Sequence, residues 1–352
     1  LNLCGNSIAK NLSLISFAGI YVKDKNAMKN VIPEYKLGTD LYGARNILVK
    51  VDDSTTTKKY DSNGNLVENS SDKDENNENI TEVEEKVNSD ELRTAENYET
   101  VKNIKKLKDK KYRDEAGLYI IEGVKMIEEA IVANAKIDKI VVCEECLKTG
   151  DIEQKLLYEI AKYDCIYVNA KVFNFLTDVV APQGILAVLE KPSKTEKIQY
   201  DQDIILALDG IQDPGNLGTI LRTADSVNLK QIIVTKTTAD SYNPKVVRST
   251  MGAILRVKVI ETDDLVATLK EIKKNKFKVV VTSLDTNDSV YDIEYNKKVI
   301  VIGNEANGVS KEVQAIADNR VKIPMLGKTE SLNASVATGI MLYEYVRQKI
   351  NK

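Results

Sequence analysis

The sequence predicts an α/β protein whose C-terminal part, residues 198–352, forms a mostly parallel β-sheet covered by helices. Strand-like and helix-like segments alternate throughout this part of the chain. Its first strand, residues 204–209 (IILALD), is a near-continuous apolar run, as expected for a strand that is buried on both faces of a sheet. Polar and glycine-containing turns follow the predicted strands directly, at the edge where parallel sheets bind their ligands.

The elements of this C-terminal part follow one another closely. Strands are expected at residues 204–209, 231–235, 256–260, 278–284, 297–303 and 321–325. Helices are expected at residues 216–228, 243–249 and 263–274, in a short stretch after Ser310, and in a long stretch from Asn333. Asn216 is expected to begin the first helix, because asparagine is favoured at helix N-caps.

Residues 101–192 predict a second, smaller α/β domain. It begins with a basic helix or arm, Lys102–Arg113, which holds seven Lys or Arg residues and one Asp. Strands are then expected at residues 118–123, 137–143, 165–169 and 184–192, and helices at residues 124–135 and 151–163. Pro192 and the polar run after it are expected to form a linker.

Residues 1–100 differ in composition from the rest of the chain. Residues 61–100 hold thirteen Asp or Glu residues against three Lys or Arg residues, so the net charge of −3 for the whole chain leaves residues 101–352 mildly basic. The tract Ser54–Thr100 is expected to be a disordered linker, because it has little to bury. The apolar run Leu12–Val22 is shorter than the roughly 18 residues of a membrane span. We therefore expect no membrane association for residues 101–352.

Residues 20–109 resemble the start of SecD, a membrane subunit of bacterial protein translocation. The resemblance rests on the run from Pro33 to Asp52, on DSTTTKKYDSNGNLVE after it, and on VNSDELRTAENYETVKNIKKLKD. It implies a fusion or an assembly artefact without a function of its own, because no later SecD region follows. A poorly ordered N-terminal extension fits the composition equally well.

The chain contains no histidine, and this absence excludes whole classes of chemistry. Ser-His-Asp and Cys-His catalysis, acid–base work by histidine and most catalytic zinc sites are ruled out. Cys143 and Cys146 form one CxxC, but no second cysteine pair completes a metal site, so we expect ordinary thiols and no metal. Four cysteines in 352 residues fit a reducing compartment, which favours the cytoplasm.

Three segments that follow predicted strands carry the candidate chemistry. The first is DPGNLGTILRTAD, which places Asn216 and Arg222 on one helix, beside an N-terminus that can hold an anion. The second is GNEANG, in which Gly303 would let a ligand approach the backbone and Glu305 is a carboxylate at a strand exit. The third is IPMLGKTESLNASVATGI, in which Ser331 and Asn333 precede the last helix. Each segment alone is weak evidence, because such turns are common.

Taken together and in this order, the three segments closely resemble the three motifs of the SpoU (TrmH) class of SPOUT RNA methyltransferases. Residues 103–192 also resemble the small substrate-binding domain of that family, notably at KYRDEAGLYIIEG, so the resemblance covers about 250 residues. One departure is Ala306, where the family more often has glycine. If that position requires a positive φ, the turn is expected to be strained.

The resemblance implies a trefoil knot in the C-terminal sheet and a homodimer in which the arginine of one subunit lies near the cofactor of the other. It also implies S-adenosylmethionine (SAM) as cofactor, bound largely by the backbone of the loops after three strands. The cofactor contacts implied by position are Thr282, Leu284, Gly303, Asn304, Ile323, Met325 and Leu332.

The implied reaction is methyl transfer to a ribose 2′-hydroxyl of RNA, without a metal. Arg222 matches the catalytic arginine of the family, and a guanidinium remains protonated in proteins. We therefore expect it to fix a phosphate and to stabilise developing alkoxide charge. Asn216 and Asn333 would orient Arg222 and the ribose, and Ser331 and Glu305 would complete the network. RNA phosphate contacts are expected from the basic arm, at Lys102, Lys105, Lys106, Lys110, Lys111 and Arg113.

The sequence leaves several alternatives open. 23S ribosomal RNA is the first expected substrate and transfer RNA the second, and the modified nucleotide and the proton acceptor are not identified. The chain could instead be a non-catalytic RNA-binding protein of the same fold, or it could methylate a base. A role of the SecD-like segment at a membrane is a further alternative.

Overall fold

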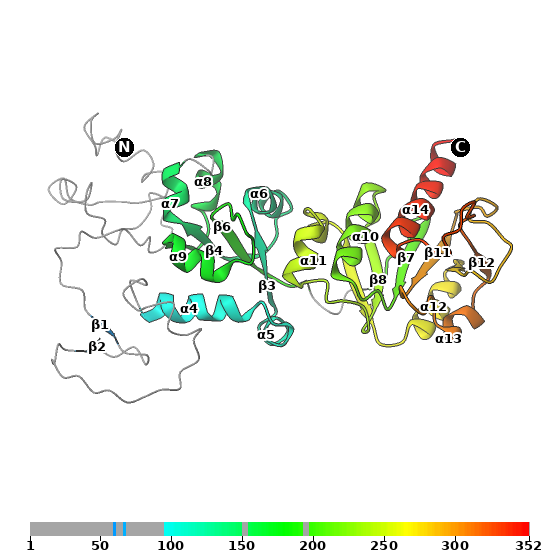
Figure 1. Ribbon diagram of the computed structural model, residues 1–352, viewed down its shortest axis with the longest axis horizontal. Coiled ribbons are helices and arrows are strands. Elements are labelled where there is room, and N and C mark those ends of the chain that lie inside the picture. The colour runs from blue at the N-terminus through cyan, green and yellow to red at the C-terminus, as the bar shows by residue number, and fades with distance from the viewer. Residues whose placement is uncertain (1–58, 61–65, 68–94, 150–153, 193–196, 352) are drawn as a thin grey trace. The chain divides into compact units, whose positions relative to one another are not determined.

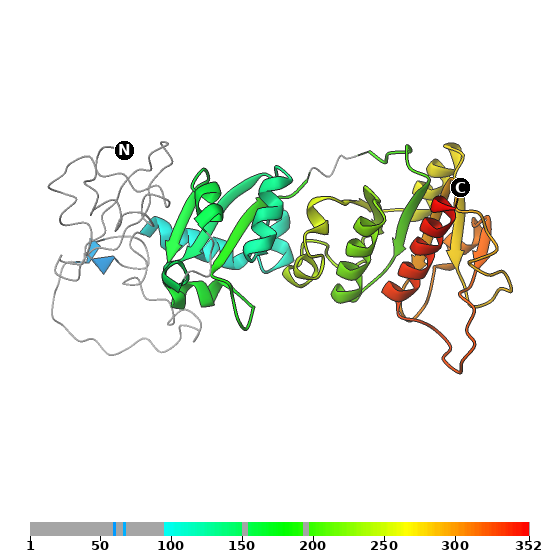
Figure 2. The same ribbon diagram turned by 90° about the horizontal axis from the view of Figure 1, so that it is seen from above.

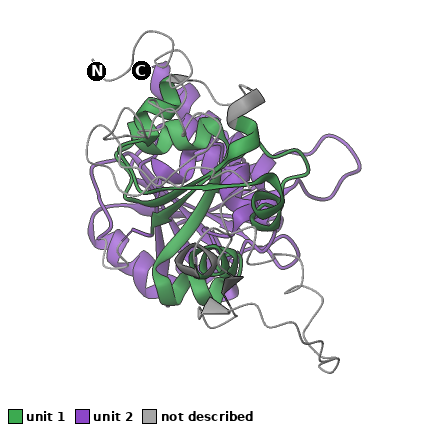
Figure 3. Cartoon of the chain, turned by 90° about the vertical axis from the view of Figure 1, so that its left-hand side faces the viewer, with its two compact units in different colours: residues 1–190 green, residues 191–352 purple. Residues whose placement is uncertain are grey.

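The computed structural model describes residues 59–60, 66–67, 95–149, 154–192 and 197–351. The chain divides into two compact units, residues 1–190 and residues 191–352, drawn in green and purple in Figure 3. The short strands β1 (Lys59–Tyr60) and β2 (Leu66–Val67) pair antiparallel. Most of the predicted acidic linker and of the SecD-like segment lies outside the described residues.

The first unit contains a four-stranded mixed sheet in the order β3-β6-β4-β5. Its strands are β3 (Leu118–Glu122), β4 (Ile137–Cys143), β5 (Cys165–Val168) and β6 (Ile185–Glu190). β6 pairs antiparallel with both neighbours, and β4 and β5 are parallel. The four strands predicted for this region are confirmed. The helices are α4 (Ala95–Lys106), α5 (Lys110–Ala116), α6 (Val124–Val132), α7 (Glu144–Thr149), α8 (Gln154–Ile160) and α9 (Ala170–Leu176).

The first helix of this unit begins earlier than the sequence predicted. α4 starts at Ala95, so the expected disorder up to Thr100 is wrong for the last six residues of that tract. Val101, Ile104 and Leu107 recur every three residues and are buried in the core of the unit together with residues of the sheet and of α9. This apolar stripe fixes the helix against the sheet.

The second unit is built on the parallel sheet that the sequence predicted as mostly parallel, and all its strand pairs are parallel (Figure 1). Six strands lie in the order β12-β10-β11-β7-β8-β9. They are β7 (Ile204–Asp209), β8 (Gln231–Thr235), β9 (Lys258–Thr262), β10 (Lys278–Thr282), β11 (Lys298–Gly303) and β12 (Asn319–Val321). All the carboxyl ends therefore meet at one edge.

Helices cover both faces of this sheet. They are α10 (Pro214–Ser226), α11 (Pro244–Ser249), α12 (Leu265–Lys274), α13 (Lys311–Ala315) and α14 (Ala334–Ile350), with a short 3₁₀ turn, η3, at Ala253–Leu255. α12 and α13 pack on the face that includes Ile205 and Ala207. α10 and α14 contact each other, and α14 contacts β11 (Figure 2). Successive residues of β7 point to opposite faces, and Ile204 to Leu208 are fully buried.

The chain crosses the carboxyl edge of the sheet before its last helix. β12 is an edge strand, yet α14 packs near the centre, against α10 and β11. Residues 323–333 therefore run back across the strand exits, which is the path expected of a trefoil-knotted SPOUT sheet. The predicted strand 321–325 is placed too late, because β12 ends at Val321 and Pro324 lacks the N–H that a ladder requires.

Within the ranges that the structure describes, no helix combines the length and the apolar character that crossing a bilayer requires.

Candidate active site

Helix α10 presents the side chain of Asn216 at the exit of β7. Asp213 is the N-cap, since its carboxylate accepts a hydrogen bond from the Asn216 backbone N–H at 2.7 Å, and Pro214 occupies the first helical position. The prediction that Asn216 caps the helix is therefore wrong. A carboxylate followed by a proline with a preset φ outcompetes an asparagine three residues later. The carboxamide of Asn216 is left to bond outside its own helix.

Three side chains from different strand exits meet in what we call the polar junction, formed by Asn216, Glu305 and Asn333. The Asn333 amide Nδ2 donates to Asn216 Oδ1 at 2.8 Å, and Asn216 Nδ2 donates to Glu305 Oε1 at 2.9 Å. Asn333 also caps α14, because its Oδ1 accepts from the backbone N–H groups of Ser335 and Val336. The junction thus joins the exits of β7 and β11 to the start of the last helix.

Glu305 is the charged member of the polar junction. Besides Asn216, the backbone N–H groups of Gln212 and Asp213 donate to its carboxylate, at 3.2 and 3.4 Å. Partial burial by itself raises the pKa of Glu305, but these hydrogen bonds outweigh it and hold the pKa below its ordinary value. Glu305 is therefore ionised at neutral pH and acts as a hydrogen-bond acceptor.

The lowered pKa of Glu305 predicts a pH-dependent contribution to stability. Because the pKa is depressed in the folded state, the contribution is present above the ordinary glutamate pKa of about 4.3 and is lost as pH falls through the folded value. The free energy of unfolding of the unmodified chain should therefore exceed that of Glu305→Gln at pH 7, and the difference should shrink in acid. Urea unfolding at several pH values measures this difference. The exposed Glu312 supplies the control Glu312→Gln, and equal profiles for both variants would contradict the prediction.

The turn after β11 explains the glycine at position 303. Asn304 and Gly308 exchange two backbone hydrogen bonds, of 3.0 and 2.9 Å, so the chain folds back at once. A Cβ at Gly303 would lie 2.0 Å from the carbonyl carbon of Gly308. The predicted reason, close approach of a ligand, is thus replaced by close approach of the turn of the chain itself. Gly308 has φ of 68°, whereas Ala306 is not at positive φ, so the strain considered for Ala306 does not arise.

The side chain of Asn304 is used within the protein. Its Nδ2 donates to Gly210 O at 2.8 Å, and its Oδ1 accepts from the backbone N–H groups of Ala306 and Asn307. These bonds tie the turn after β11 to the residue that follows β7. The side chain is therefore occupied, and both backbone groups of Asn304 already bond to Gly308, so the predicted cofactor contact at this position stays a prediction.

Arg222 and Ser331 make no hydrogen bond to the polar junction in the part of the chain that the structure describes. Arg222 is exposed on α10, two turns beyond the helix start, and has no hydrogen bond or ion pair within the described ranges. Ser331 is also exposed and has no such partner there, so the expectation that it completes the network is not matched. The structure therefore brings together three of the five predicted catalytic residues.

The predicted cofactor residues lie at neighbouring strand exits. Thr282 ends β10, with its hydroxyl 3.4 Å from Val301 O, and Leu284 follows it with 69% of its surface exposed. The predicted residues Ile323, Met325 and Leu332 are half-buried in the segment between β12 and α14. The same segment contains Leu326, a fully exposed leucine that the sequence analysis missed. The available signal was a leucine that continues the apolar run Ile323–Met325 up to the start of the polar loop.

The basic arm of the first unit divides into exposed and structural residues. Lys106, Lys110 and Lys111 are exposed, and Lys102 and Lys105 are half-buried. Lys105 Nζ lies 4.6 Å from the centre of the Phe175 ring, and burial lowers the pKa of Lys105 to about 8.

Arg113 does not fit the predicted RNA-contact role. It is 1% exposed, and its guanidinium donates to the carbonyls of Leu107 and Lys108, both at 2.7 Å. These carbonyls lie just after α4, where they have no partner within the helix. Arg113 therefore fastens α4 to α5 from inside the unit, and its assignment as a phosphate contact is corrected.

The cysteines of the first unit are structural thiols. Cys143 ends β4, Cys146 lies on α7, and both are free, as is Cys165. Burial raises the pKa of Cys143 to about 12, which disfavours the reactive thiolate. In the described part of the chain, no group of three or more side chains suited to hold a metal ion comes together.

Both units of the chain match known protein families. Residues 203–343 match the SpoU rRNA Methylase family, and residues 98–187 match the MRM3-like substrate binding domain. A relative from Bacillus subtilis, named 23S rRNA (guanosine(2553)-2′-O)-methyltransferase RlmP, is 32% identical over 72% of this chain and 97% of its own length.

Solved structures show the same architecture. The SpoU methyltransferase AviRb from Streptomyces viridochromogenes, in complex with SAM, has a TM-score of 0.64 at 26% identity, over 71% of this chain and 98% of that one. An rRNA methyltransferase from Sinorhizobium meliloti, also bound to SAM, has a TM-score of 0.60 at 30% identity, over 70% of this chain and 94% of that one. The chain therefore belongs to the SpoU rRNA methylase family of methyltransferases.

Proposed function

We propose that this chain transfers a methyl group from SAM to a ribose 2′-hydroxyl of RNA, and that its substrate is 23S ribosomal RNA. The polar junction is the observation that carries the proposal. Asn216, Glu305 and Asn333 come from three segments up to 117 residues apart, and their hydrogen bonds hold these segments at one edge of a parallel sheet. This is the edge at which such sheets bind ligands.

The residues at the strand exits fit SAM. Leu284 and Leu326 follow β10 and β12, which are neighbours in the sheet, and both leucines are largely exposed. Such exposed apolar side chains suit the adenine and methylene parts of the cofactor. When bound, SAM supplies an electrophilic methyl group on a positively charged sulfur. We assign its binding to Leu284, Leu326 and the backbone of Gly303, Ile323 and Leu332.

The chain's own residues would position the RNA and stabilise charge. Arg222 remains protonated and can bind a phosphate next to the reacting ribose. As the 2′-hydroxyl loses its proton, the guanidinium also stabilises the negative charge that develops on the oxygen. Asn216 and Asn333 orient this region, and the anionic Glu305 fixes the carboxamide of Asn216. Placing the two reactants together supplies much of the acceleration.

We also propose that the chain acts as a homodimer in the cytoplasm, where its RNA substrate is found. Val336 and Tyr343 on α14 are 50% and 54% exposed, and large apolar side chains on a packed helix suit a subunit contact. In such a dimer Arg222 of one subunit would lie near the cofactor bound to the partner subunit and would contact the RNA there. Sedimentation velocity should give twice the mass of the chain, and a monomer at micromolar concentration would count against the dimer.

The function is tested by methyl transfer in vitro. Purified protein is incubated with methyl-labelled SAM and with total RNA from cells that lack the gene, and the RNA is digested to nucleosides. The proposal expects label in a 2′-O-methylnucleoside from 23S rRNA. Label on a base would indicate base methylation, and label in transfer RNA would change the substrate. A protein that binds RNA but not SAM would be the non-catalytic alternative.

Two N-terminal deletions test whether the residues before α4 contribute to activity or to folding. Deletion of residues 1–94 should leave methyl transfer within about two-fold of the full chain, since the family matches span residues 98–343. Deletion of residues 1–107 also removes Val101, Ile104 and Leu107 from the core and should destabilise the first unit by several kcal/mol. Activity assays and thermal unfolding measure both effects. A large loss of methyl transfer on deletion of residues 1–94 would support a functional SecD-like segment instead.

A further inference from the structure

The segment between β10 and β11 braces two neighbouring strand exits. We call residues 283–295 the bracing segment. The backbone N–H of Ser283 donates to Val321 O at 3.0 Å, and further along the segment Asp288 O accepts from the N–H of Lys322 at 2.9 Å. Val290 N–H donates to Lys322 O, also at 2.9 Å. Both backbone groups of Lys322 are therefore fixed, and they set the direction in which Ile323 leaves β12.

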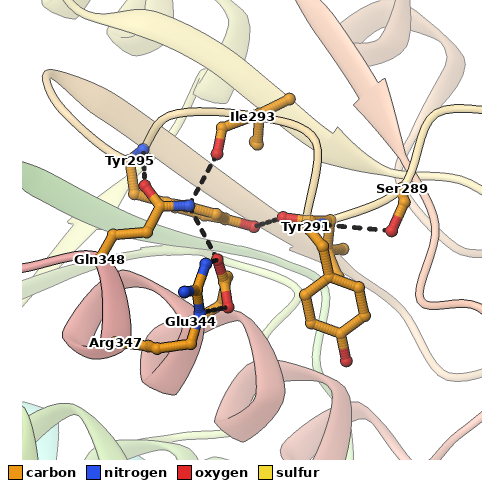
Figure 4. A network of polar contacts seen from close by, with 8 residues as sticks. Ser289, Tyr291, Ile293, Tyr295, Glu344, Arg347 and Gln348 are labelled. Atoms are coloured by element: carbon orange, nitrogen blue, oxygen red, sulfur yellow. Dashed lines mark hydrogen bonds and ion pairs between the residues drawn. The ribbon is translucent and has the colours of Figure 1, made fainter. Parts of the chain in front are cut away.

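Gln348 on α14 bonds to the last residues of the bracing segment (Figure 4). Its Nε2 donates to Ile293 O at 2.9 Å and to Glu344 Oε1 at 2.8 Å, while its Oε1 accepts from Tyr295 N–H at 2.9 Å. One carboxamide thus bonds two backbone groups of the segment and one carboxylate of the helix. The carboxylate of Glu344 is 2.8 Å from Arg347, which balances its charge.

Tyr295 connects Gln348 to the strand exit. The backbone of Tyr295 bonds to Gln348, and its hydroxyl donates to Val290 O at 3.0 Å. Val290 is the residue whose N–H bonds to Lys322. The contacts therefore run without interruption from Gln348 through Tyr295 and Val290 to Lys322, the residue before Ile323.

The central residues of this path are shielded from water, whereas Gln348 and Lys322 at its two ends are half-buried. Tyr295 is 3% exposed, Val290 is fully buried and Glu344 is 5% exposed. Burial also raises the pKa of Tyr295 above its ordinary value. Water cannot readily replace a bond lost here, so removing one partner leaves a buried polar group unsatisfied. The segment would then shift to satisfy that group.

We propose that Gln348 and Tyr295 are positioning residues for the SAM site, although neither belongs to the strand exits. They hold the bracing segment, which begins directly after Thr282, includes Leu284 and fixes the departure of Ile323. They should thus preorganise two of the three cofactor segments before SAM binds, which is how a distant contact can contribute to affinity. This inference rests on the proposed SAM-dependent function.

The gentler test uses a matched pair of buried tyrosines. Tyr295→Phe removes only the hydroxyl bond to Val290. Tyr345→Phe removes the hydroxyl bond to Asp203 and the bond that the hydroxyl accepts from Lys349. Asp203 directly precedes β7, so these bonds lie at the opposite edge of the sheet. Isothermal titration calorimetry with SAM should show a Kd three- to ten-fold higher for Tyr295→Phe and unchanged for Tyr345→Phe, and urea unfolding should show whether the two variants lose comparable stability.

The stronger test uses a matched pair of glutamines. Gln348→Leu removes both backbone bonds to the bracing segment and also the bond to Glu344. Gln231 is the first residue of β8 and also bonds two backbone groups, both of Gln199. Gln231→Leu removes these two bonds. Gln348→Leu should raise the KM for SAM about ten-fold, while kcat at saturating SAM and the KM for RNA stay within two-fold. Gln231→Leu should leave all three values unchanged.

Two results would overturn the inference. One is an unchanged affinity for SAM in both Tyr295→Phe and Gln348→Leu. The other is an equal loss of affinity in the control variants, which would show that general stability and not this path controls the site. If the unmodified chain fails to bind SAM, the proposed function fails with it, whereas normal SAM binding with unaffected variants overturns only the positioning role.

Discussion

Replacing Arg222 with alanine is expected to lower kcat for RNA methylation by about 10²- to 10³-fold, in line with the loss of one preorganised group that stabilises developing charge. The Kd for SAM should stay within about two-fold, because Arg222 lies on α10 and not among the segments assigned to the cofactor. The guanidinium is exposed and has no polar partner in the described part of the chain, so its removal leaves no buried charge behind. Single-turnover methylation with saturating SAM measures the effect.

Arg222→Lys is the informative companion. Lysine retains the positive charge but cannot bind a phosphate through two parallel hydrogen bonds, so an intermediate rate is expected. Thermal unfolding should show that both variants are as stable as the unmodified chain, since surface substitutions usually change stability by less than about 0.5 kcal/mol. Full activity of Arg222→Ala would remove Arg222 from the mechanism.

Replacing Gly303 with alanine is expected to destabilise the second unit by about 3 kcal/mol or more, at the upper end of the cost of overpacking. The added Cβ would lie 2.0 Å from Gly308 C, 2.1 Å from Val309 N and 2.4 Å from Gly308 O. All three are backbone atoms, so no side chain can rotate away. SAM binding and activity should be lost with the turn, and urea unfolding measures the loss of stability.

Two other glycines serve as controls for Gly303. Gly308 has φ of 68° and open space around its Cα, so Gly308→Ala should cost only the roughly 1–2 kcal/mol of a left-handed alanine. Gly327 has neither positive φ nor a neighbour within 4 Å of the added Cβ, and Gly327→Ala should be neutral. Equal stability of all three variants would show that the turn after β11 is not packed as described.

Much of the fold followed from the pattern of apolar residues. Residues 204–208 and 279–281 are buried on both faces, which only central strands of a covered sheet permit. The grouping of Asn216, Glu305 and Asn333 was implied by the family resemblance, and it agrees with their places after strands, because parallel strands bring such positions to one edge. The hydrogen bonds among them required the structure.

The remaining features depend on contacts between distant residues. The cap of α10 was assigned to Asn216, because the competition between two acceptors three residues apart is decided by local geometry. The role of Gly303 depends on a turn that closes five residues later. Arg113 carries the positive charge expected of an RNA contact, but it is buried in the first unit. Gln348 acts through residues more than 50 positions away, and no periodicity in the sequence indicates this.

The most direct test of the account is a crystal structure of the chain with S-adenosylhomocysteine. We expect the adenosyl group against Leu284, Gly303 and Leu332, with its sulfur facing the polar junction and the Arg222 of one protomer or of its symmetric partner. A cofactor bound elsewhere, or an Arg222 remote from the sulfur in both protomers, would contradict the assignment of these strand exits as the site of methyl transfer.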